Sequence, residues 1–280
     1  MTSEDGIVTT KYTVSVSGQI RDFGFDEWET IKSSTSGSTE QYDVPKGLYG
    51  TSNPGIMTIN EMFGSNLPEL FSYTVSPVEG QSGKAAKLQT VYTYMFLNGM
   101  DFNALLGGLV PYVTAGSLFT GIFKTDMNNT LNSTKFGVPF VGEPATFTGY
   151  YKYTPGTTYY NNKNEVVADK TDECSIYAVL YEELLDEENN NIPLNGDYND
   201  PDLYIGSSKR IVMKAVLEDG TAKSDWTKFS IPFKLLEGKS YDATKKYYLA
   251  IVCSSSAEGD YFMGAPGSTL FIDSFTVTPQ

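Results

Sequence analysis

Short stretches in which apolar and polar residues alternate recur along most of the chain. In residues 11–20, for example, Tyr12, Val14 and Val16 alternate with smaller or polar neighbours. A period of two residues is that of a half-buried β-strand. Clusters of Gly, Pro, Asn or Asp separate most of the stretches, as turns require. The other predicted strands are residues 56–60, 71–75, 85–94, 117–124, 145–153, 174–182, 209–218, 226–233, 247–254 and 268–277.

This pattern predicts an all-β fold, an antiparallel β-sandwich with few short helices. Two packed sheets suit so many strands better than a parallel sheet, because amphipathic helices between the strands are missing. Residues 101–109 are the exception and predict one short helix or turn. The acidic and aromatic segment at residues 23–29 and the apolar strand at residues 267–277 are predicted to lie together. Residues 155–173 and 183–208 are long enough to be functional or disordered loops.

The chain is predicted to form one large domain behind a short leading segment. We assign residues 1–22 to a linker or junction strand from a preceding domain and residues 23–280 to the β-sandwich, which often reaches this length undivided. The first residues lack the basic and apolar regions of a signal peptide. No run of 18 apolar residues occurs. We therefore expect no membrane insertion by this segment.

The charge balance limits the classes of partner. With 34 acidic against 20 basic residues, the chain carries a formal charge of -14. Such a charge repels phosphate backbones, so nucleic acid is not an expected partner. The acids also offer oxygen ligands for a hard cation such as calcium, although a merely solvated acidic surface explains them equally well.

The absence of histidine from the sequence narrows the chemistry further. It excludes a Ser-His-Asp triad, a Cys-His dyad and a His-ligated zinc or iron within this chain. Catalysis would have to rest on carboxylates, Tyr, Lys or a bound ion. Cys174 and Cys253 lie in apolar strand-like runs, where free cysteines act as small buried hydrophobes. A disulfide between them stays open, because the sequence does not give their separation.

Seven segments stand in a fixed order along the chain. They are FDEWE (25–29), YGTSNPG (49–55), GKAAKLQT (83–90), GSLFTGIF (116–123), FTGYYKYTPG (147–156), CSIYAVLYE (174–182) and SSSAEGDYFMGAPGSTLFIDSF (254–275). Together they resemble the Bacteroidetes family called the putative carbohydrate metabolism domain. The resemblance implies a jelly-roll, galactose-binding-like domain related to carbohydrate-binding modules. It also implies an immunoglobulin-like domain before it, in a secreted or cell-surface lipoprotein. In this family a Trp often precedes the Gly-Thr-Ser-Asn turn, where this chain has Tyr49.

Sugar binding needs aromatic faces for the C–H side of a pyranose and planar polar groups for its hydroxyls. Both kinds of group occur in the N-terminal motifs and along two predicted strands, where alternate residues share a face. The opposing interpretation is that the rings belong to an aromatic-rich core and that the polar residues line a solvated sheet face. The candidate carbohydrate-binding residues are Trp28, Tyr49, Asn53, Lys87, Gln89, Tyr151 and Tyr153.

One acid, Asp273, interrupts the apolar terminal strand. A buried carboxylate without a partner is costly, so it should meet a cation, a basic side chain or backbone donors. By analogy with jelly-roll modules, Asp26 or Glu27 could share a structural calcium with Asp273. Strand alternation could instead place Asp273 in water.

The expected function is noncatalytic carbohydrate binding in a surface glycan-processing system, with a polysaccharide as the partner. A glycoside hydrolase is the first alternative and needs two carboxylates, about 5 to 5.5 Å apart for retention or about 6.5 to 9.5 Å for inversion. An adhesin or structural protein-interaction module is the second alternative. The candidate catalytic pairs for a hydrolase come from Glu27, Glu29, Glu182 and Glu183.

Overall fold

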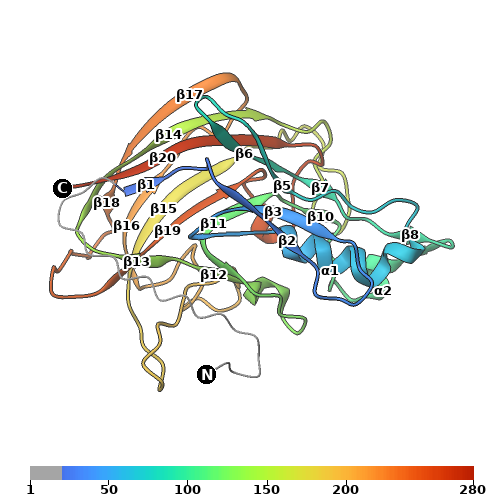
Figure 1. The fold of residues 1–280 in the computed structure, drawn as a ribbon, viewed down its shortest axis with the longest axis horizontal. Helices are drawn as coiled ribbons and strands as arrows, with labels where there is room; N and C mark the ends of the chain where they lie inside the picture. The colour runs from blue at the N-terminus through green and yellow to red at the C-terminus, as the bar shows by residue number, and fades with distance from the viewer. Residues whose placement is uncertain (1–20) are drawn as a thin grey trace.

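The computed structural model describes residues 21–280, and its two large antiparallel sheets pack as a sandwich (Figure 1). The predicted fold class is thereby confirmed. The first sheet has the order β17-β14-β20-β6-β5, with β1 paired to β20. Its strands are β17 (Lys223–Pro232), β14 (Pro144–Thr154), β20 (Thr269–Pro279), β6 (Lys84–Gln89), β5 (Val75–Glu79) and β1 (Arg21–Phe23).

The second sheet has the order β12-β11-β19-β15-β16-β18, with β13 paired to β19 and β4 to β11. Its strands are β12 (Thr134–Phe136), β11 (Ser117–Phe123), β19 (Tyr247–Ser254), β15 (Ser175–Glu182), β16 (Ile211–Val216), β18 (Lys234–Leu235), β13 (Val138–Phe140) and β4 (Tyr49–Thr51). Three small ladders complete the strands: β2 (Trp28–Lys32) with β3 (Gln41–Pro45), β7 (Val91–Tyr92) with β10 (Val113–Thr114), and β8 (Phe96–Leu97) with β9 (Met100–Asp101).

The main core fills the space between the two sheets. Along β20, Leu270 and Ile272 are fully buried, and along β15, Ile176 and Leu180 are fully buried. The first and last described strands lie side by side, as the sequence predicted for the two ends of the domain, because β1 pairs with β20. The pairing uses residues 21–23 rather than the acidic segment that follows them, with Phe23 opposite Phe275.

The outer face of the second sheet is also largely covered. Phe119, Val179 and Tyr181 point away from the main core and pack with Leu194 and Ile205 of the long 183–208 loop. That loop and residues 155–173 contain no extended strand, as predicted, and are held by isolated bridges. A sheet buried on both faces explains the near-continuous apolar sequence of β15.

One predicted strand is wrong, because residues 56–60 belong to an α-helix. Helix α1 (Asn53–Phe63) begins with Pro54 in its first turn, where a missing N–H costs nothing. Ile56 and Ile59 lie on one face at helical spacing and pack in a satellite core with Met95. Residues 71–75 contribute only Val75 to a strand. The strand predicted over residues 11–20 lies outside the described residues.

The remaining helices are short. Helix α2 (Phe102–Leu105) falls within the predicted 101–109 segment and is capped by Asp101, whose carboxylate accepts a 3.0 Å bond from the N–H of Ala104. Helix α1, helix α2 and β8 gather at one end of the sandwich (Figure 1). The single-turn 3-10 helices are Gly64–Asn66, Thr130–Ser133 and Gly259–Tyr261. Within residues 21–280 no helix is long and apolar enough to cross a membrane.

Candidate carbohydrate site

A cavity of about 250 Å³ opens on the outer face of the second sheet. Strands β11, β19 and β15 form its floor. Helix α1 and the segments around residues 109–115, 123–136, 196–205 and 256–262 form its walls. The walls therefore come from loops and a helix, and the floor from rigid sheet.

Two cross-strand rows make up the floor. Ser254 of β19 lies opposite Ser117 of β11 on one side and opposite Ser175 of β15 on the other. We call these three residues the serine row. Two residues away on each strand, Val252 of β19 lies opposite Phe119 of β11 on one side and opposite Tyr177 of β15 on the other. We call these three residues the apolar row. Because residues two apart share a face, both rows face the cavity, and all six residues line it.

Two hydroxyls of the serine row are free to bind a ligand. Ser254 donates a 2.7 Å bond from Oγ to the carbonyl of Ser256. Within residues 21–280 the hydroxyls of Ser117 and Ser175 make no hydrogen bond, and both residues are partly exposed to the cavity. The floor thus pairs hydroxyl groups with an adjacent apolar surface.

Asp260 is the one carboxylate among the described residues that line the cavity. Its Oδ2 accepts a hydrogen bond from the hydroxyl of Tyr204. The residue as a whole is exposed, but desolvation of its carboxylate raises the pKa of Asp260, against the opposing effect of the Tyr204 bond. Burial raises the pKa of Tyr177 well above its ordinary value, and the Asp260 charge adds to this. Asp260 and Tyr177 line the same cavity.

A buried carboxylate holds the wall that carries Asp260. Asp172 is 2% exposed, and its Oδ2 accepts bonds from Ser256 Oγ at 2.6 Å, Ala265 N at 2.8 Å and Ser268 Oγ at 2.7 Å. Its Oδ1 accepts from the N–H of Glu173 at 3.0 Å. Burial raises the pKa of Asp172 while these bonds oppose the rise. The network ties both ends of residues 256–268 to one point.

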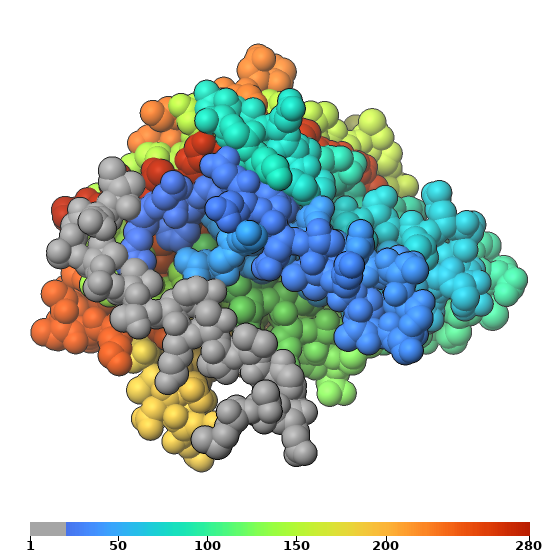
Figure 2. All heavy atoms as spheres, in the orientation of Figure 1, coloured from blue at the N-terminus to red at the C-terminus, as the bar shows by residue number. Residues whose placement is uncertain are grey.

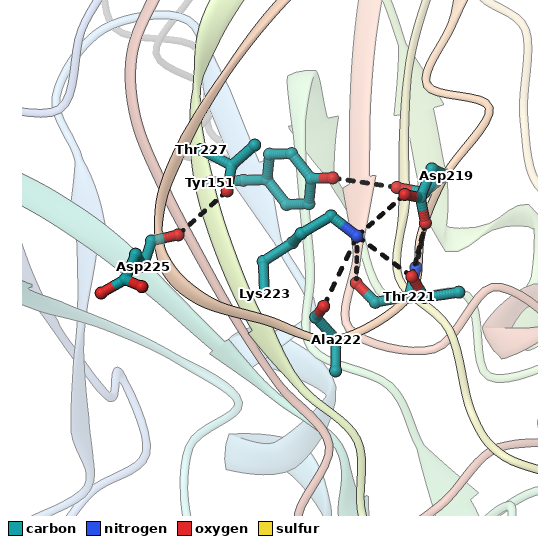
Figure 3. A network of polar contacts seen from close by, with 7 residues as sticks. All are labelled: Tyr151, Asp219, Thr221, Ala222, Lys223, Asp225 and Thr227. Carbon is teal, nitrogen blue, oxygen red and sulfur yellow. Dashed lines mark hydrogen bonds and ion pairs between the residues drawn. The ribbon is translucent and has the colours of Figure 1, made fainter.

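The residues predicted to bind sugar do not line this cavity. Tyr151 and Tyr153 share a face as expected, but that face is the core, where they are 2% and 1% exposed. The Tyr151 hydroxyl donates to the carbonyl of Asp219 at 2.9 Å, in a turn also bound by Lys223 (Figure 3). The Tyr153 hydroxyl donates to the carbonyl of Ser255 at 3.0 Å. In this structure neither ring offers a face to a ligand.

The N-terminal candidates also have structural partners. Tyr49 packs on Phe25 and donates a 2.5 Å bond to the carbonyl of Phe23. Asn53 is fully buried and binds the N–H and carbonyl of Val75 at 2.9 and 2.7 Å. Trp28 is half-buried, and its indole N–H donates to the carbonyl of Phe25 at 2.6 Å. Figure 2 shows the segment of β2 and β3, in blue, on the surface of the molecule.

Lys87 and Gln89 share the outer face of the first sheet, as strand alternation predicted. Lys87 lies opposite Phe271, which in turn lies opposite Lys152. The Lys152 amine sits 4.8 Å from the ring centres of both Trp226 and Phe271. This face is on the far side of the sandwich from the cavity floor, so Lys87 and Gln89 cannot belong to the same site.

The candidate calcium ligands meet at one turn but do not form a metal cluster. Asp273 is 2% exposed and accepts bonds from the backbone N–H groups of Gln81 and Ser82. Asp26 accepts a 3.0 Å bond from the N–H of Lys84 in the same β5–β6 turn. Glu27 pairs with a lysine instead. Among residues 21–280 no group of three or more His, Cys, Asp or Glu side chains could hold a metal.

The candidate hydrolase carboxylates lie in two places, at the start of β2 and at the end of β15. Glu27 precedes β2 and forms an ion pair with Lys46 at 3.3 Å, while Glu29 is exposed on β2. Glu182 at the end of β15 pairs with Lys245 at 2.7 Å, and Glu183 pairs with Lys246 at 3.7 Å. None of the four lines the cavity.

The two cysteines are free and buried. Burial raises the pKa of Cys174 to about 12 and that of Cys253 well above its ordinary value. Both side chains lie in the main core and act there as small apolar groups, as expected.

Sequence reasoning missed the cavity residues. A usable signal existed: Ser117 and Ser175 each stand two residues before an aromatic residue in a predicted strand, and Ser254 stands two residues after Val252. The three serines are neighbours only because the strands follow the order β11-β19-β15 in the observed register. The sequence alone supplied neither the order nor the register.

The fold and the cavity define a β-sandwich protein with a concave cavity on the outer face of one sheet. The chain belongs to the family described as the putative carbohydrate metabolism domain, whose model matches residues 24–278. The resemblance seen in the sequence is thereby confirmed. A comparison with curated proteins found no match.

Two solved structures from Bacteroides are similar over nearly the whole chain. A protein of Bacteroides thetaiotaomicron VPI-5482, described as a putative glycoside hydrolase, is 29% identical with a TM-score of 0.72; the match covers 95% of this chain and 72% of that one. A protein of Bacteroides vulgatus ATCC 8482 with the same description is 26% identical with a TM-score of 0.68; the match covers 92% of this chain and 98% of that one.

Proposed function

We propose that this chain binds carbohydrate in the cavity on the second sheet without cleaving it. The observation that carries this proposal is the two-row floor. The apolar row, with Phe119 and Tyr177, offers a surface to the C–H face of a sugar ring, and the free hydroxyls of Ser117 and Ser175 can bond its hydroxyl edge. Membership of a carbohydrate-metabolism family supports the same ligand class.

The number of carboxylates favours binding over hydrolysis. Glycoside hydrolysis in most families uses two carboxylates that flank the scissile bond. Of the described residues that line the cavity, Asp260 alone carries one. The description of the two Bacteroides relatives as putative glycoside hydrolases keeps hydrolysis as the second candidate. Release of reducing sugar that is abolished by Asp260→Asn would establish that alternative.

The test is titration calorimetry of the chain against a broad panel of plant, host and microbial glycans. Ser175→Trp places a bulky side chain on the cavity floor and should abolish binding. Ser230→Trp is the matched control, because Ser230 is exposed on β17 in the other sheet. A cooperative unfolding transition should first be shown for both variants, so that the comparison is between folded proteins. No binding to any glycan, or equal loss in both variants, would refute the proposal.

We further propose that the domain works at the cell surface as part of a lipoprotein and of a glycan-processing system. The family resemblance supports this location. Fractionation of the source cells, followed by protease accessibility of the domain on intact cells, tests it. Recovery of the protein only from the cytoplasmic fraction would contradict it.

A further inference from the structure

The walls above the cavity floor are strongly apolar. Helix α1 contributes Ile59, Met62 and Phe63, and the segments beyond the floor contribute Phe123, Met127 and Phe262. Met62 and Met127 are 50% and 42% exposed, so these walls keep apolar surface uncovered. A ligand that fills the cavity must place apolar atoms against them.

On the walls formed by helix α1 and by residues 109–115 and 256–262, the polar groups are mostly engaged within the protein. The Thr58 hydroxyl donates to the carbonyl of Pro54 at 2.9 Å, and Thr114 shares a 2.9 Å bond with Thr93. Ser256 donates to Asp172, as described above. These hydroxyls line the cavity but have their partners already.

The polar capacity left for a ligand lies on the floor, on the 123–136 segment and at Asp260, and not on the helix α1 wall. Among the described lining residues it includes the hydroxyls of Ser117 and Ser175, the Asp260 carboxylate, and the hydroxyls of Thr125, Thr130 and Thr134. A fully hydroxylated pyranose carries hydroxyls around its whole rim. Those that faced Ile59, Met62 or Phe63 of helix α1 would lose their water without gaining a partner, which is unfavourable.

The size of the cavity points to one sugar unit. Its volume of about 250 Å³ is just below the about 300–1,000 Å³ of pockets that hold drug-sized ligands. It suits a terminal or branching unit rather than several units of a chain.

We propose that the cavity selects a sugar unit bearing an apolar substituent, namely a deoxy, O-methyl or O-acetyl group, with its hydroxyl edge on the serine row. This inference rests on the proposed function and specifies its ligand. The apolar substituent packs against the helix α1 wall formed by Ile59, Met62 and Phe63, and the remaining hydroxyls bind Ser117, Ser175 and Asp260.

The test compares matched sugars that differ only in the substituent. The pairs are methyl α-L-fucopyranoside with methyl α-L-galactopyranoside, 4-O-methyl-glucuronoxylan fragments with their unmethylated forms, and acetylated with deacetylated xylo-oligosaccharides. Titration calorimetry should show about tenfold or greater preference for the substituted member of at least one pair, which corresponds to about 1.4 kcal/mol. Equal or weaker binding of the substituted member in every pair would overturn this inference while leaving sugar binding intact.

A wall variant separates the inference from the general proposal. Met62→Gln keeps the length of the side chain but adds polar atoms, and it should reduce the preference within a pair more than the affinity for the unsubstituted sugar. Met100→Gln is the control, because Met100 is 52% exposed on β9 and does not line the cavity. An unchanged preference in Met62→Gln would overturn the inference. No binding of any sugar by the unmodified chain would refute the proposed function itself.

Discussion

The carboxylate of Asp273 accepts a 2.7 Å hydrogen bond from the backbone N–H of Gln81 in the turn between β5 and β6. The same oxygen accepts a 3.0 Å bond from Ser82. A side chain on Gly80 would come within 2.6 Å of that oxygen, so the glycine permits the close approach. An acid in the middle of an apolar strand is thus explained by backbone donors from a neighbouring turn.

Replacing Asp273 should therefore destabilise the fold. Asp273→Ala leaves two backbone N–H groups without their partner, and we expect the free energy of unfolding to fall by about 1–3 kcal/mol. Urea unfolding measures this change in the free energy of unfolding. Asp225→Ala on exposed β17 is the control and should change stability by no more than about 0.5 kcal/mol. Equal effects would show that the Asp273 bonds contribute nothing specific.

Calcium should not stabilise the protein through Asp26, Glu27 and Asp273. Backbone N–H groups already occupy an oxygen of Asp26 and of Asp273, and Glu27 pairs with Lys46. The melting temperature should be the same in EDTA and in excess calcium, because an ion that binds the folded state would raise it. A rise with calcium that Asp273→Ala abolishes would contradict this expectation.

Tyr151 and Tyr153 should matter for stability and not for ligand binding. Loss of one hydroxyl in Tyr151→Phe or Tyr153→Phe removes a bond to a backbone carbonyl and should cost about 0.5–1.5 kcal/mol. Sugar affinity at 25 °C should stay unchanged, because neither ring lines the cavity. A folded Tyr151→Phe variant that loses sugar binding in calorimetry would place the site on a different face.

The stability that Asp172 confers should depend on pH in a defined direction. Burial raises its pKa in the folded state, so the folded chain holds the proton more tightly than the unfolded chain. The contribution of Asp172 is then greatest below the unfolded-state value of about 3.9 and declines as pH rises through the raised folded-state pKa. Urea unfolding from pH 4 to 7 gives the free energies of unfolding of the wild type and of Asp172→Asn. The difference between the two should shrink as the pH rises. A difference that grows with pH would contradict the raised pKa.

Much of the sandwich could be predicted because strand periodicity is local. The alternation of apolar and polar residues at 145–153 and the continuous apolar run at 247–254 became β14 and β19 with nearly the same bounds. The strand prediction for residues 56–60 failed because Ile56, Met57 and Ile59 fit a short buried strand as well as a helix. The Asn53-Pro54 pair in the first helical turn was the local signal that decides between them.

The site could not be predicted in the same way because it is assembled by register and loop packing. Ser117 and Ser175 meet around Ser254 only once β19 lies between β11 and β15. Asp260 reaches the cavity through a loop held by Asp172, nearly ninety residues earlier in the chain. Tyr151 and Tyr153 were chosen because they are aromatic. A ring can stack on a sugar only if it is exposed, and its exposure depends on how the sheets pack.

Sugar affinity should fall on acidification with a midpoint above the ordinary pKa of an aspartate. Desolvation raises the pKa of Asp260, so its carboxylate takes up a proton at a higher pH than an exposed acid does. The protonated group is a poorer acceptor for sugar hydroxyls, and binding weakens as pH drops through that pKa. Calorimetry from pH 7 to 4 measures the midpoint.

Two variants identify the group responsible for that pH dependence. Asp260→Asn should bind more weakly at neutral pH and lose the dependence, because it has no proton to take up in this range. Asp219→Asn should keep the wild-type midpoint, since Asp219 lies outside the cavity and bonds to Lys223 and Thr221 lower its pKa to about 2. An unchanged midpoint in Asp260→Asn would remove Asp260 from the binding site.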